Sequence, residues 1–225
     1  MGSILTTSSS KGGAGKSTLC IVLAVNLATR HKIAVIDADR NQSFAAWYGH
    51  AYEGPTMEVR SEVDHIRVVD LAGELAETHD VVIVDTAGFE NLTAASAIGM
   101  ADHVAIPCMP DRGSVRETLR TAQQVASLAK AARRTIPYSV ILTRWKPRGL
   151  AERATIESLQ EAGHPMLTQY LTDSADYAKL SFTGFVPISG RVGNEADRII
   201  DELRAKGAIP ARPSKSKEGK AGKVL

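Results

Sequence analysis

Short apolar runs alternate with longer amphipathic stretches along most of the chain. The apolar runs are rich in β-branched residues, and they predict strands at residues 4–8, 33–37, 56–60, 81–85, 103–107 and 138–143. The intervening stretches predict helices at residues 17–29, 66–77, 114–133, 150–162 and 194–206. Continuous runs such as Val81-Val82-Ile83-Val84 are typical of strands that are buried on both faces.

The order of these elements predicts an α/β fold with a mainly parallel, twisted sheet and helices on both of its faces. Strands that alternate with helices are joined by right-handed crossovers, which keep the strands parallel. The last predicted helix carries Ala196, Ile199, Ile200 and Leu203 at the spacing of one packing face. In such sheets ligands bind at the carboxyl ends of the strands, so we expect the functional residues there.

Length and composition fit one soluble domain in a reducing compartment. The chain has 225 residues, of which 44% are hydrophobic and 23% charged, and this suffices for one sizeable core. No apolar run is long enough to cross a membrane, and no signal-peptide pattern precedes the first strand. The two cysteines, Cys20 and Cys108, lie far apart in the sequence, as is usual for cytoplasmic proteins. We therefore expect a cytoplasmic protein.

Basic residues gather at the C-terminal end. From residue 208 onward, five Lys or Arg side chains accompany one Glu, a net charge of +4, which leaves −2 for residues 1–207 out of the total of +2. The Pro, Ser, Gly and Lys content predicts a disordered tail at 208–225, after a single domain at 1–207. Such a tail can attract DNA or an anionic surface, and it can equally serve only for solubility.

A glycine-rich segment lies between the first predicted strand and the first predicted helix. Strand, glycine loop, Lys-Ser and helix, in this order, are typical of a phosphate-binding loop. The glycines let backbone N–H groups approach phosphate oxygens, and the helix N-terminus adds partial positive charge. We expect Lys16 to neutralise the β- and γ-phosphates and Ser17 to hold Mg²⁺.

Acidic residues end two further apolar runs. Asp37 and Asp39 are two residues apart at the end of the second predicted strand and are expected to lie on one face. Beside a triphosphate, one such carboxylate serves Mg²⁺ and the other positions the attacking water. Asp85 ends the fourth predicted strand and is expected to hold Mg²⁺, while Gly88 lets a backbone N–H approach the γ-phosphate.

Together these segments resemble the ParA/MinD family of ATPases, and most of all its short ParA-type partition members. The usual phosphate loop begins with a glycine where this chain has Ser10, and Lys11 follows to give the Lys-Gly-Gly-x-Gly-Lys-Ser form of that family. Residues 37–43 and 82–88 resemble two further boxes of a partition ATPase. Arg40 and Asn41 depart from the Pro-Gln that commonly follows the second Asp in the family.

The resemblance implies a homodimer that sandwiches ATP and hydrolyses it with Mg²⁺. Lys11 would reach the phosphates held by the partner subunit, and with Lys16 and Asp39 it would form the catalytic set. Ser17, Asp37 and Asp85 would serve the metal. The nucleotide-binding set would comprise Lys11, Gly12, Gly13, Ala14, Gly15, Lys16, Ser17, Thr18 and Gly88, with Thr143 and Arg144 near the adenine.

ParA-type ATP dimers bind DNA nonspecifically, which requires phosphate-contacting cations on one face. The candidate DNA contacts are Arg144, Lys146 and Arg148, which cluster after a predicted strand, together with Lys179 and Arg191. The resemblance also implies a small adaptor protein, ParB-like or linked to a cargo, that stimulates hydrolysis, and an ATP state on the nucleoid. It leaves the cargo open among a plasmid, a chromosome, a carboxysome, a receptor array and conjugation machinery.

Two other classes of ATPase remain as alternatives. A division-site regulator of the MinD kind would bind membrane through an amphipathic C-terminal helix, and the polar C-terminal residues argue against one, so no membrane partner is expected. A metal-centre maturation or reductase ATPase would need cluster cysteines near the dimer interface. Cys20 in the first helix and Cys108 at a strand end favour ordinary buried packing instead.

Overall fold

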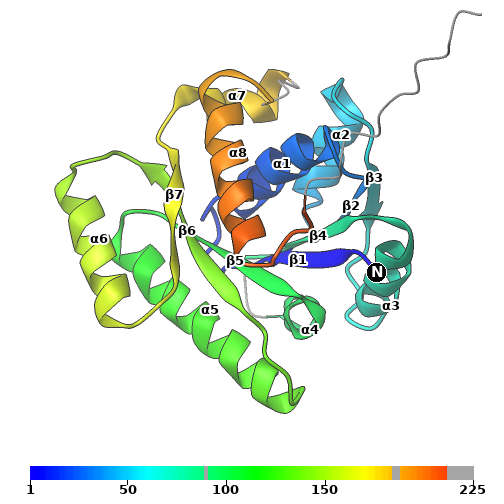
Figure 1. The fold of residues 1–225 in the computed structure, drawn as a ribbon, viewed down its shortest axis with the longest axis horizontal. Helices are drawn as coiled ribbons and strands as arrows, with labels where there is room; N and C mark the ends of the chain where they lie inside the picture. The colour runs from blue at the N-terminus through cyan, green and yellow to red at the C-terminus, as the bar shows by residue number, and fades with distance from the viewer. Residues whose placement is uncertain (89–90, 184–187, 212–225) are drawn as a thin grey trace, which may run out of the picture.

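A seven-stranded parallel sheet forms the centre of the protein (Figure 1). The computed structural model describes residues 1–88, 91–183 and 188–211. In spatial order the strands are β3 (Glu58–Ser61), β2 (Ile33–Ala38), β4 (Val81–Thr86), β1 (Ser3–Thr7), β5 (His103–Cys108), β6 (Tyr138–Trp145) and β7 (Met166–Thr172). The first strand therefore lies in the middle of the sheet, and the chain winds outward from it in both directions.

Helices cover both faces of the sheet, as Figure 1 shows. One face packs against α1 (Lys16–Ala28), α2 (Ser43–Ala51), α7 (Ala175–Thr183) and α8 (Gly190–Ala205). The other face packs against α3 (Arg67–Thr78), α4 (Leu92–Met100), α5 (Arg112–Ala131) and α6 (Leu150–Glu161). The predicted α/β fold with helices on both faces is thus confirmed.

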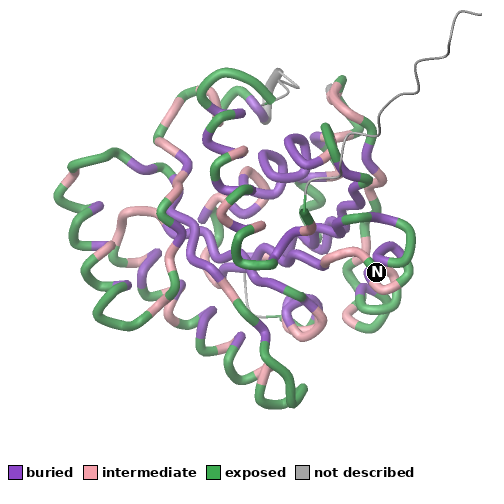
Figure 2. The backbone as a smooth tube through the Cα atoms, viewed as in Figure 1, coloured by how far each residue is buried: buried purple, intermediate pink, exposed green. Residues whose placement is uncertain are grey.

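The central strands are buried on both faces, which explains their unbroken apolar sequences. In β4, Val81 and Ile83 belong to the core cluster under α1 and α8, while Val82 and Val84 belong to the cluster under α3. All four side chains are fully inaccessible to solvent. Figure 2 shows the same division between a buried sheet and half-exposed helices.

Four elements were not predicted from the sequence, namely β7, α2, α4 and α7. β7 is an edge strand with only two fully buried positions, Leu167 and Leu171, so it lacks an apolar run. α2 and α4 are nine residues long, so the 3.6-residue period of a helix repeats too few times in their sequences to be recognised. The strands and helices that were predicted all occur, with ends shifted by up to four residues.

The packed body continues past residue 207, where the sequence predicted it to end. α8 ends at Ala205, and Gly207 beyond it adopts a left-handed φ of 75°, so the chain turns back and the Ala208 N–H donates to the Leu203 carbonyl at 3.0 Å. Ala208 and Ile209 are buried in the core under α1 and α8. From residue 212 onward, the predicted basic tail lies outside the described residues.

Candidate functional site

The phosphate loop connects the central strand β1 to α1. Gly13 and Gly15 have φ values of 75° and 90°, a conformation that side chains other than glycine rarely adopt. Gly15 is the N-cap of α1, so the helix begins at Lys16 with its N-terminus next to the loop. Ser10, which replaces the usual glycine, is hydrogen-bonded through both its N–H and its hydroxyl to Thr121 Oγ1 of α5, at 3.1 and 3.2 Å.

Lys16 is buried at the centre of this loop. Its ammonium group donates to the Lys11 carbonyl at 3.3 Å, so it bridges the two ends of the glycine segment. Burial lowers the pKa of Lys16, and the carboxylates of Asp85 and Asp39 partly offset this effect. A buried ammonium at the N-terminus of a helix suits the neutralisation of phosphate oxygens.

Asp85 lies at the carboxyl end of β4, level with Thr7 of β1 and Asp37 of β2. It is completely buried, and Thr7 Oγ1 donates to its Oδ1 at 3.3 Å. Burial raises the pKa of Asp85 to about 6, against the opposing effects of the Ser17 hydroxyl and the Lys16 ammonium. Among the described residues, no hydrogen-bond donor reaches Asp85 Oδ2.

This orphaned oxygen fits a Mg²⁺ site. A buried polar atom without a partner is costly, and a hard cation with oxygen ligands is a natural partner for a carboxylate next to a serine hydroxyl. Ser17 stands in the first turn of α1 and lies close enough to influence the pKa of Asp85. Ser17 and Asp85 are therefore the side chains that would hold the ion, directly or through water.

Asp37 and Asp39 differ more than the sequence predicted. Asp37 is fully buried in β2, and its two oxygens accept from the backbone N–H groups of Asp39 at 3.2 Å and Ala45 at 2.9 Å. Burial raises the pKa of Asp37, and these hydrogen bonds limit the rise. Asp39 lies just beyond the end of β2, half-buried, where its Oδ1 accepts from the Asn41 N–H at 2.9 Å. Asp37 thus anchors the start of α2, and Asp39 is the more accessible carboxylate.

Gly88 lies directly against the phosphate loop. A Cβ atom at this position would lie 3.0 Å from Gly12 Cα and 3.1 Å from Lys16 Nζ. The segment after β4 therefore packs closely on the phosphate loop, and a side chain at this position would require Gly12 or the end of Lys16 to shift by a few tenths of an ångström. The approach of the Gly88 backbone N–H to a γ-phosphate stays a prediction.

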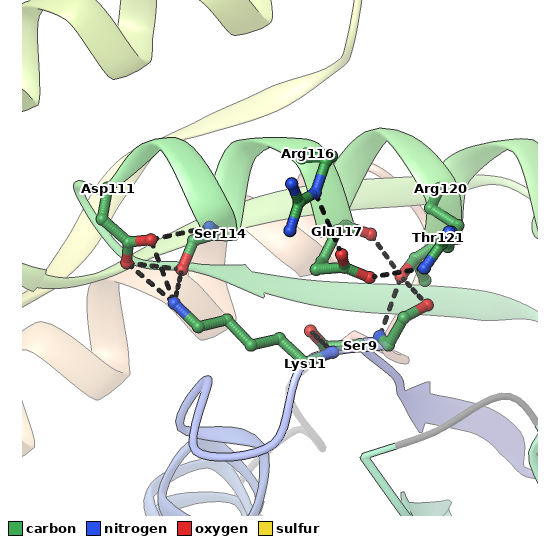
Figure 3. Close-up of polar contacts among 9 residues, drawn as sticks. Ser9, Lys11, Asp111, Ser114, Arg116, Glu117, Arg120 and Thr121 are labelled. Carbon is green, nitrogen blue, oxygen red and sulfur yellow. Dashed lines mark hydrogen bonds and ion pairs between the residues drawn. The ribbon is translucent and has the colours of Figure 1, made fainter.

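The side chain of Lys11 turns toward the N-terminus of α5 (Figure 3). Its Nζ lies 3.0 Å from both carboxylate oxygens of Asp111 and 3.0 Å from Ser114 Oγ. The sequence analysis assigned no role to Asp111 or Ser114. The available signal was an Asp three residues before a Ser at a helix start, which is typical of an N-cap and does not by itself indicate a partner for Lys11.

The two residues predicted near the adenine lie at the end of β6. Thr143 is buried, and its hydroxyl donates to the Ala14 carbonyl of the phosphate loop at 3.4 Å. Arg144 is exposed and has a left-handed φ of 51° within an irregular part of the strand. Thr143 is thus placed against the nucleotide loop, whereas Arg144 points to solvent.

All five predicted DNA-contacting side chains are exposed, namely Arg144, Lys146, Arg148, Lys179 and Arg191. Two of them form ion pairs, Lys146 with Asp173 at 2.8 Å and Lys179 with Asp176 at 2.9 Å. The Lys146 hydrogen bond, with the charge of Arg144 nearby, lowers the pKa of Asp173. The cations of this region are therefore interleaved with carboxylates.

Comparison with known proteins assigns the family. The family model described as VirC1 protein matches residues 2–197. The chain belongs to the VirC1 family of ParA-type ATPases. It is 30% identical over 182 residues to the protein ParA of Rhizobium radiobacter, which covers 79% of this chain and 81% of that protein. It is also 25% identical over 201 residues to maintenance of carboxysome distribution protein A of Gloeobacter kilaueensis, covering 86% and 90% of the two chains.

Solved structures agree with this family in fold. The apo McdA of Cyanothece superposes with a TM-score of 0.78 at 18% identity, covering 91% of this chain and 99% of that one. The MinD cell division protein of Aquifex aeolicus superposes with a TM-score of 0.72 at 21% identity, covering 95% and 100%. The predicted resemblance to the ParA/MinD family is confirmed.

Two observations bear on the alternative classes. Cys20 and Cys108 are both fully buried, and Cys20 Sγ lies 2.9 Å from Thr7 Oγ1, so neither thiol is placed to hold a cluster at a surface. Within the described part of the chain, none of the helices is both long and apolar enough to cross a bilayer.

Proposed function

We propose that this ATPase dimerises around ATP, binds DNA nonspecifically in that state, and positions a cargo until a partner protein stimulates hydrolysis. The observation that carries the proposal is the arrangement of Lys11, Lys16 and the carboxylates of Asp39 and Asp85 around one phosphate loop. A second lysine at the start of the loop is what distinguishes this arrangement from that of a general nucleotide-binding protein.

Each residue has a part in hydrolysis. Lys16 binds the β- and γ-phosphates, and the N–H groups at the start of α1 orient them. Ser17 and Asp85 would hold Mg²⁺, which when bound would supply positive charge to the phosphate oxygens. Asp39, the accessible carboxylate beyond β2, orients the attacking water toward the γ-phosphate. Asp37 supports the metal site indirectly, because it accepts hydrogen bonds from the backbone of the segment between β2 and α2 and so holds that segment in place.

Lys11 acts across the dimer interface. Its side chain is 29% exposed and runs from the phosphate loop along α5 (Figure 3), so it has to turn away from α5 to reach a second subunit. An ammonium supplied by the partner subunit stabilises the charge that develops on the transferred phosphoryl group. Hydrolysis then depends on dimerisation.

DNA binding uses the exposed cations beyond β6 and β7. Arg148 has a left-handed φ of 75°, and no ion pair holds its side chain within the described ranges. Contacts of this kind with phosphates are independent of sequence and weaken with salt. We place the ATP-bound protein on the nucleoid and the protein as a whole in the cytoplasm.

The cargo is a large cellular body that has its own adaptor protein. The relatives include a protein ParA and a maintenance of carboxysome distribution protein A. We infer a cargo of the same scale, such as a plasmid or a protein-bound compartment, with a small adaptor that links it to the ATPase.

The proposal is tested by DNA binding in three nucleotide states. Purified full-length protein is mixed with plasmid DNA and Mg²⁺ in the presence of ATP, ADP or no nucleotide, and complexes are followed by sedimentation at increasing salt. We expect binding only with ATP, decreasing steeply with salt. Equal binding in all three states, or no binding in any, would contradict the proposal.

The DNA surface is tested by charge reversal with a matched control. Arg144→Glu and Arg148→Glu are expected to abolish ATP-dependent DNA binding while leaving ATP-dependent dimerisation intact. Arg116→Glu, which changes an exposed arginine on α5, is the control and should bind DNA as the wild type does. Unchanged DNA binding by the Arg144 and Arg148 variants would exclude this surface.

A further inference from the structure

The ammonium of Lys11 is fully occupied within its own subunit. A lysine ammonium has three N–H donors and no acceptor. Here it has three acceptors at 3.0 Å, the two carboxylate oxygens of Asp111 and the hydroxyl of Ser114. No donor remains for a phosphate oxygen while these contacts persist.

The acceptors are held in place independently of Lys11. Asp111 is the N-cap of α5, where its Oδ1 accepts from the Ser114 N–H at 2.8 Å and its Oδ2 from the Ser114 hydroxyl at 2.8 Å (Figure 3). Ser114 is 2% exposed. Partial burial would raise the pKa of Asp111, but the hydrogen bonds from Ser114 and Lys11 outweigh it and lower the pKa. The carboxylate is therefore charged at neutral pH.

A second contact ties the same stretch of chain to α5. Ser10, immediately before Lys11, bonds to Thr121 two helical turns beyond Ser114. The first part of the phosphate loop thus lies along α5, and the Lys11 side chain extends parallel to the helix toward its N-terminus (Figure 3).

We propose that Asp111 and Ser114 hold Lys11 in a resting position that must be given up when the ATP dimer forms. The proposal deepens the function proposed above, because it rests on Lys11 acting in the partner subunit. Asp111 is a positioning residue, since it acts through Lys11. This contact of Lys11 with Asp111 and Ser114, called the resting hold below, raises the protein concentration at which dimers form. It so keeps the protein monomeric until ATP and a second subunit are both present.

Symmetry amplifies the effect of this contact. A two-fold dimer uses two Lys11 side chains, so two ion pairs break for each dimer that forms. An ion pair that is partly exposed, as this one is at 29% and 44%, shifts an equilibrium by roughly threefold. Two such pairs shift the dimer dissociation constant by roughly tenfold.

Asp111→Asn tests the inference with little risk to the fold. Asparagine is as good an N-cap as aspartate, so the variant keeps the helix start and removes the charge that holds the ammonium. The dimer dissociation constant is measured by sedimentation of the full-length protein with Mg²⁺ and a non-hydrolysable ATP analogue. We expect dimerisation to tighten by roughly tenfold, while analogue binding to the monomer at low protein concentration stays unchanged.

Two further variants complete the experiment. Ser114→Ala removes one of the three acceptors and is expected to tighten dimerisation less than Asp111→Asn does. Asp197→Asn breaks an ion pair with Arg30 on the opposite face of the sheet, at a carboxylate that is 43% exposed, and should leave dimerisation unchanged. Thermal unfolding of each variant verifies that it is folded.

The outcomes separate this inference from the proposed function. If the wild type dimerises with the analogue but Asp111→Asn dimerises no better, or less well, the resting hold is wrong and the dimer mechanism stands. If neither protein dimerises, both the hold and the dimer mechanism are wrong. Tightening in Asp111→Asn and Ser114→Ala, with Asp197→Asn unchanged, supports the hold.

Discussion

At the scale of single residues, Asp85 combines complete burial with an oxygen that lacks a partner in the described structure. We expect Asp85→Asn to remove most of the stabilisation that Mg²⁺ adds to the ATP complex, because a neutral amide oxygen attracts a divalent cation much less than a carboxylate does. In the wild type, ligand at 100 times its dissociation constant stabilises the folded state by about 2.7 kcal/mol. The measurement is the midpoint of thermal unfolding with ATP, in Mg²⁺ and in a chelator.

The control for this prediction is Asp70→Asn, which changes an exposed aspartate on α3. Its midpoint should respond to Mg²⁺ as the wild type does. A full Mg²⁺ response in Asp85→Asn would show that another residue holds the ion.

Gly88 is a second single residue on which the phosphate loop depends, because it packs against Gly12 and Lys16. We expect Gly88→Ala to lower the rate of ATP hydrolysis by at least about tenfold, because the added methyl group would displace the loop from Gly12 and Lys16. The comparison is Gly99→Ala in α4, where an added Cβ meets no atom within 4 Å. Phosphate release assays on both variants measure the effect, and equal rates would contradict the close packing.

At the scale of elements, the Glu195 carboxylate connects three of the last four elements of the chain, β7, α7 and α8. Glu195 of α8 accepts from the backbone N–H of Thr172 at 2.9 Å, from its hydroxyl at 2.8 Å, and from the Tyr177 hydroxyl of α7 at 2.5 Å. Glu195 is 9% exposed. Burial and the Glu195 carboxylate both raise the pKa of Tyr177, which keeps its hydroxyl a donor.

We expect Glu195→Ala to lower the free energy of unfolding by about 2 to 3 kcal/mol, since it leaves three donors without their acceptor. Tyr177→Phe removes one of these bonds and should cost about 1 kcal/mol. Chemical denaturation measures both, and Glu157→Ala, at an exposed position on α6, should change stability little. Equal stability of Glu195→Ala and Glu157→Ala would show that the cluster contributes nothing.

The elements also show which features a sequence can predict. The phosphate loop, Asp85 and the central strands follow from local patterns, because a glycine loop must precede its helix and a strand buried on both faces must be apolar. Edge strand β7 has no such pattern, since solvent and α8 share its faces.

Contacts between distant segments are not readable from local patterns. Lys11 and Asp111 are 100 residues apart, and only the fold shows that the phosphate loop lies along α5. The sequence likewise indicated that Asp37 and Asp39 are paired. It gave no sign that Asp37 is already bonded to the start of α2.

At the scale of the whole molecule, stability depends on histidines near the amino ends of the strands. His103, at the start of β5, is 2% exposed, and its Nε2 lies 3.0 Å from Ser139 Oγ. Burial, helped by the charge of Lys206, lowers the pKa of His103 to about 4. Burial also lowers the pKa of His31 and of His164. All three histidines are therefore neutral in the folded protein at pH 7.

The sign of the pH dependence follows from His103. Its pKa is near 6.5 in the unfolded chain, so between pH 6.5 and 4 the unfolded state binds a proton that the folded state does not. The contribution of neutral His103 to the free energy of unfolding is fully present above pH 6.5 and is lost as the pH falls toward 4. For a shift of this size it amounts to up to roughly 3 kcal/mol. Asp85 acts in the opposite direction, because its pKa is raised to about 6 in the folded state.

The difference between wild type and His103→Asn isolates the histidine, since Asp85 is common to both proteins and cancels. We expect the variant to lose less free energy of unfolding than the wild type between pH 7 and pH 4.5, whatever its stability at pH 7. Chemical denaturation at each pH measures the two slopes, and His50→Asn, at an exposed position on α2, should keep the wild-type slope. Parallel curves for wild type and His103→Asn would mean that His103 takes up its proton at the same pH in the folded protein as in the unfolded chain, which requires a nearby negative charge to offset the effect of its burial.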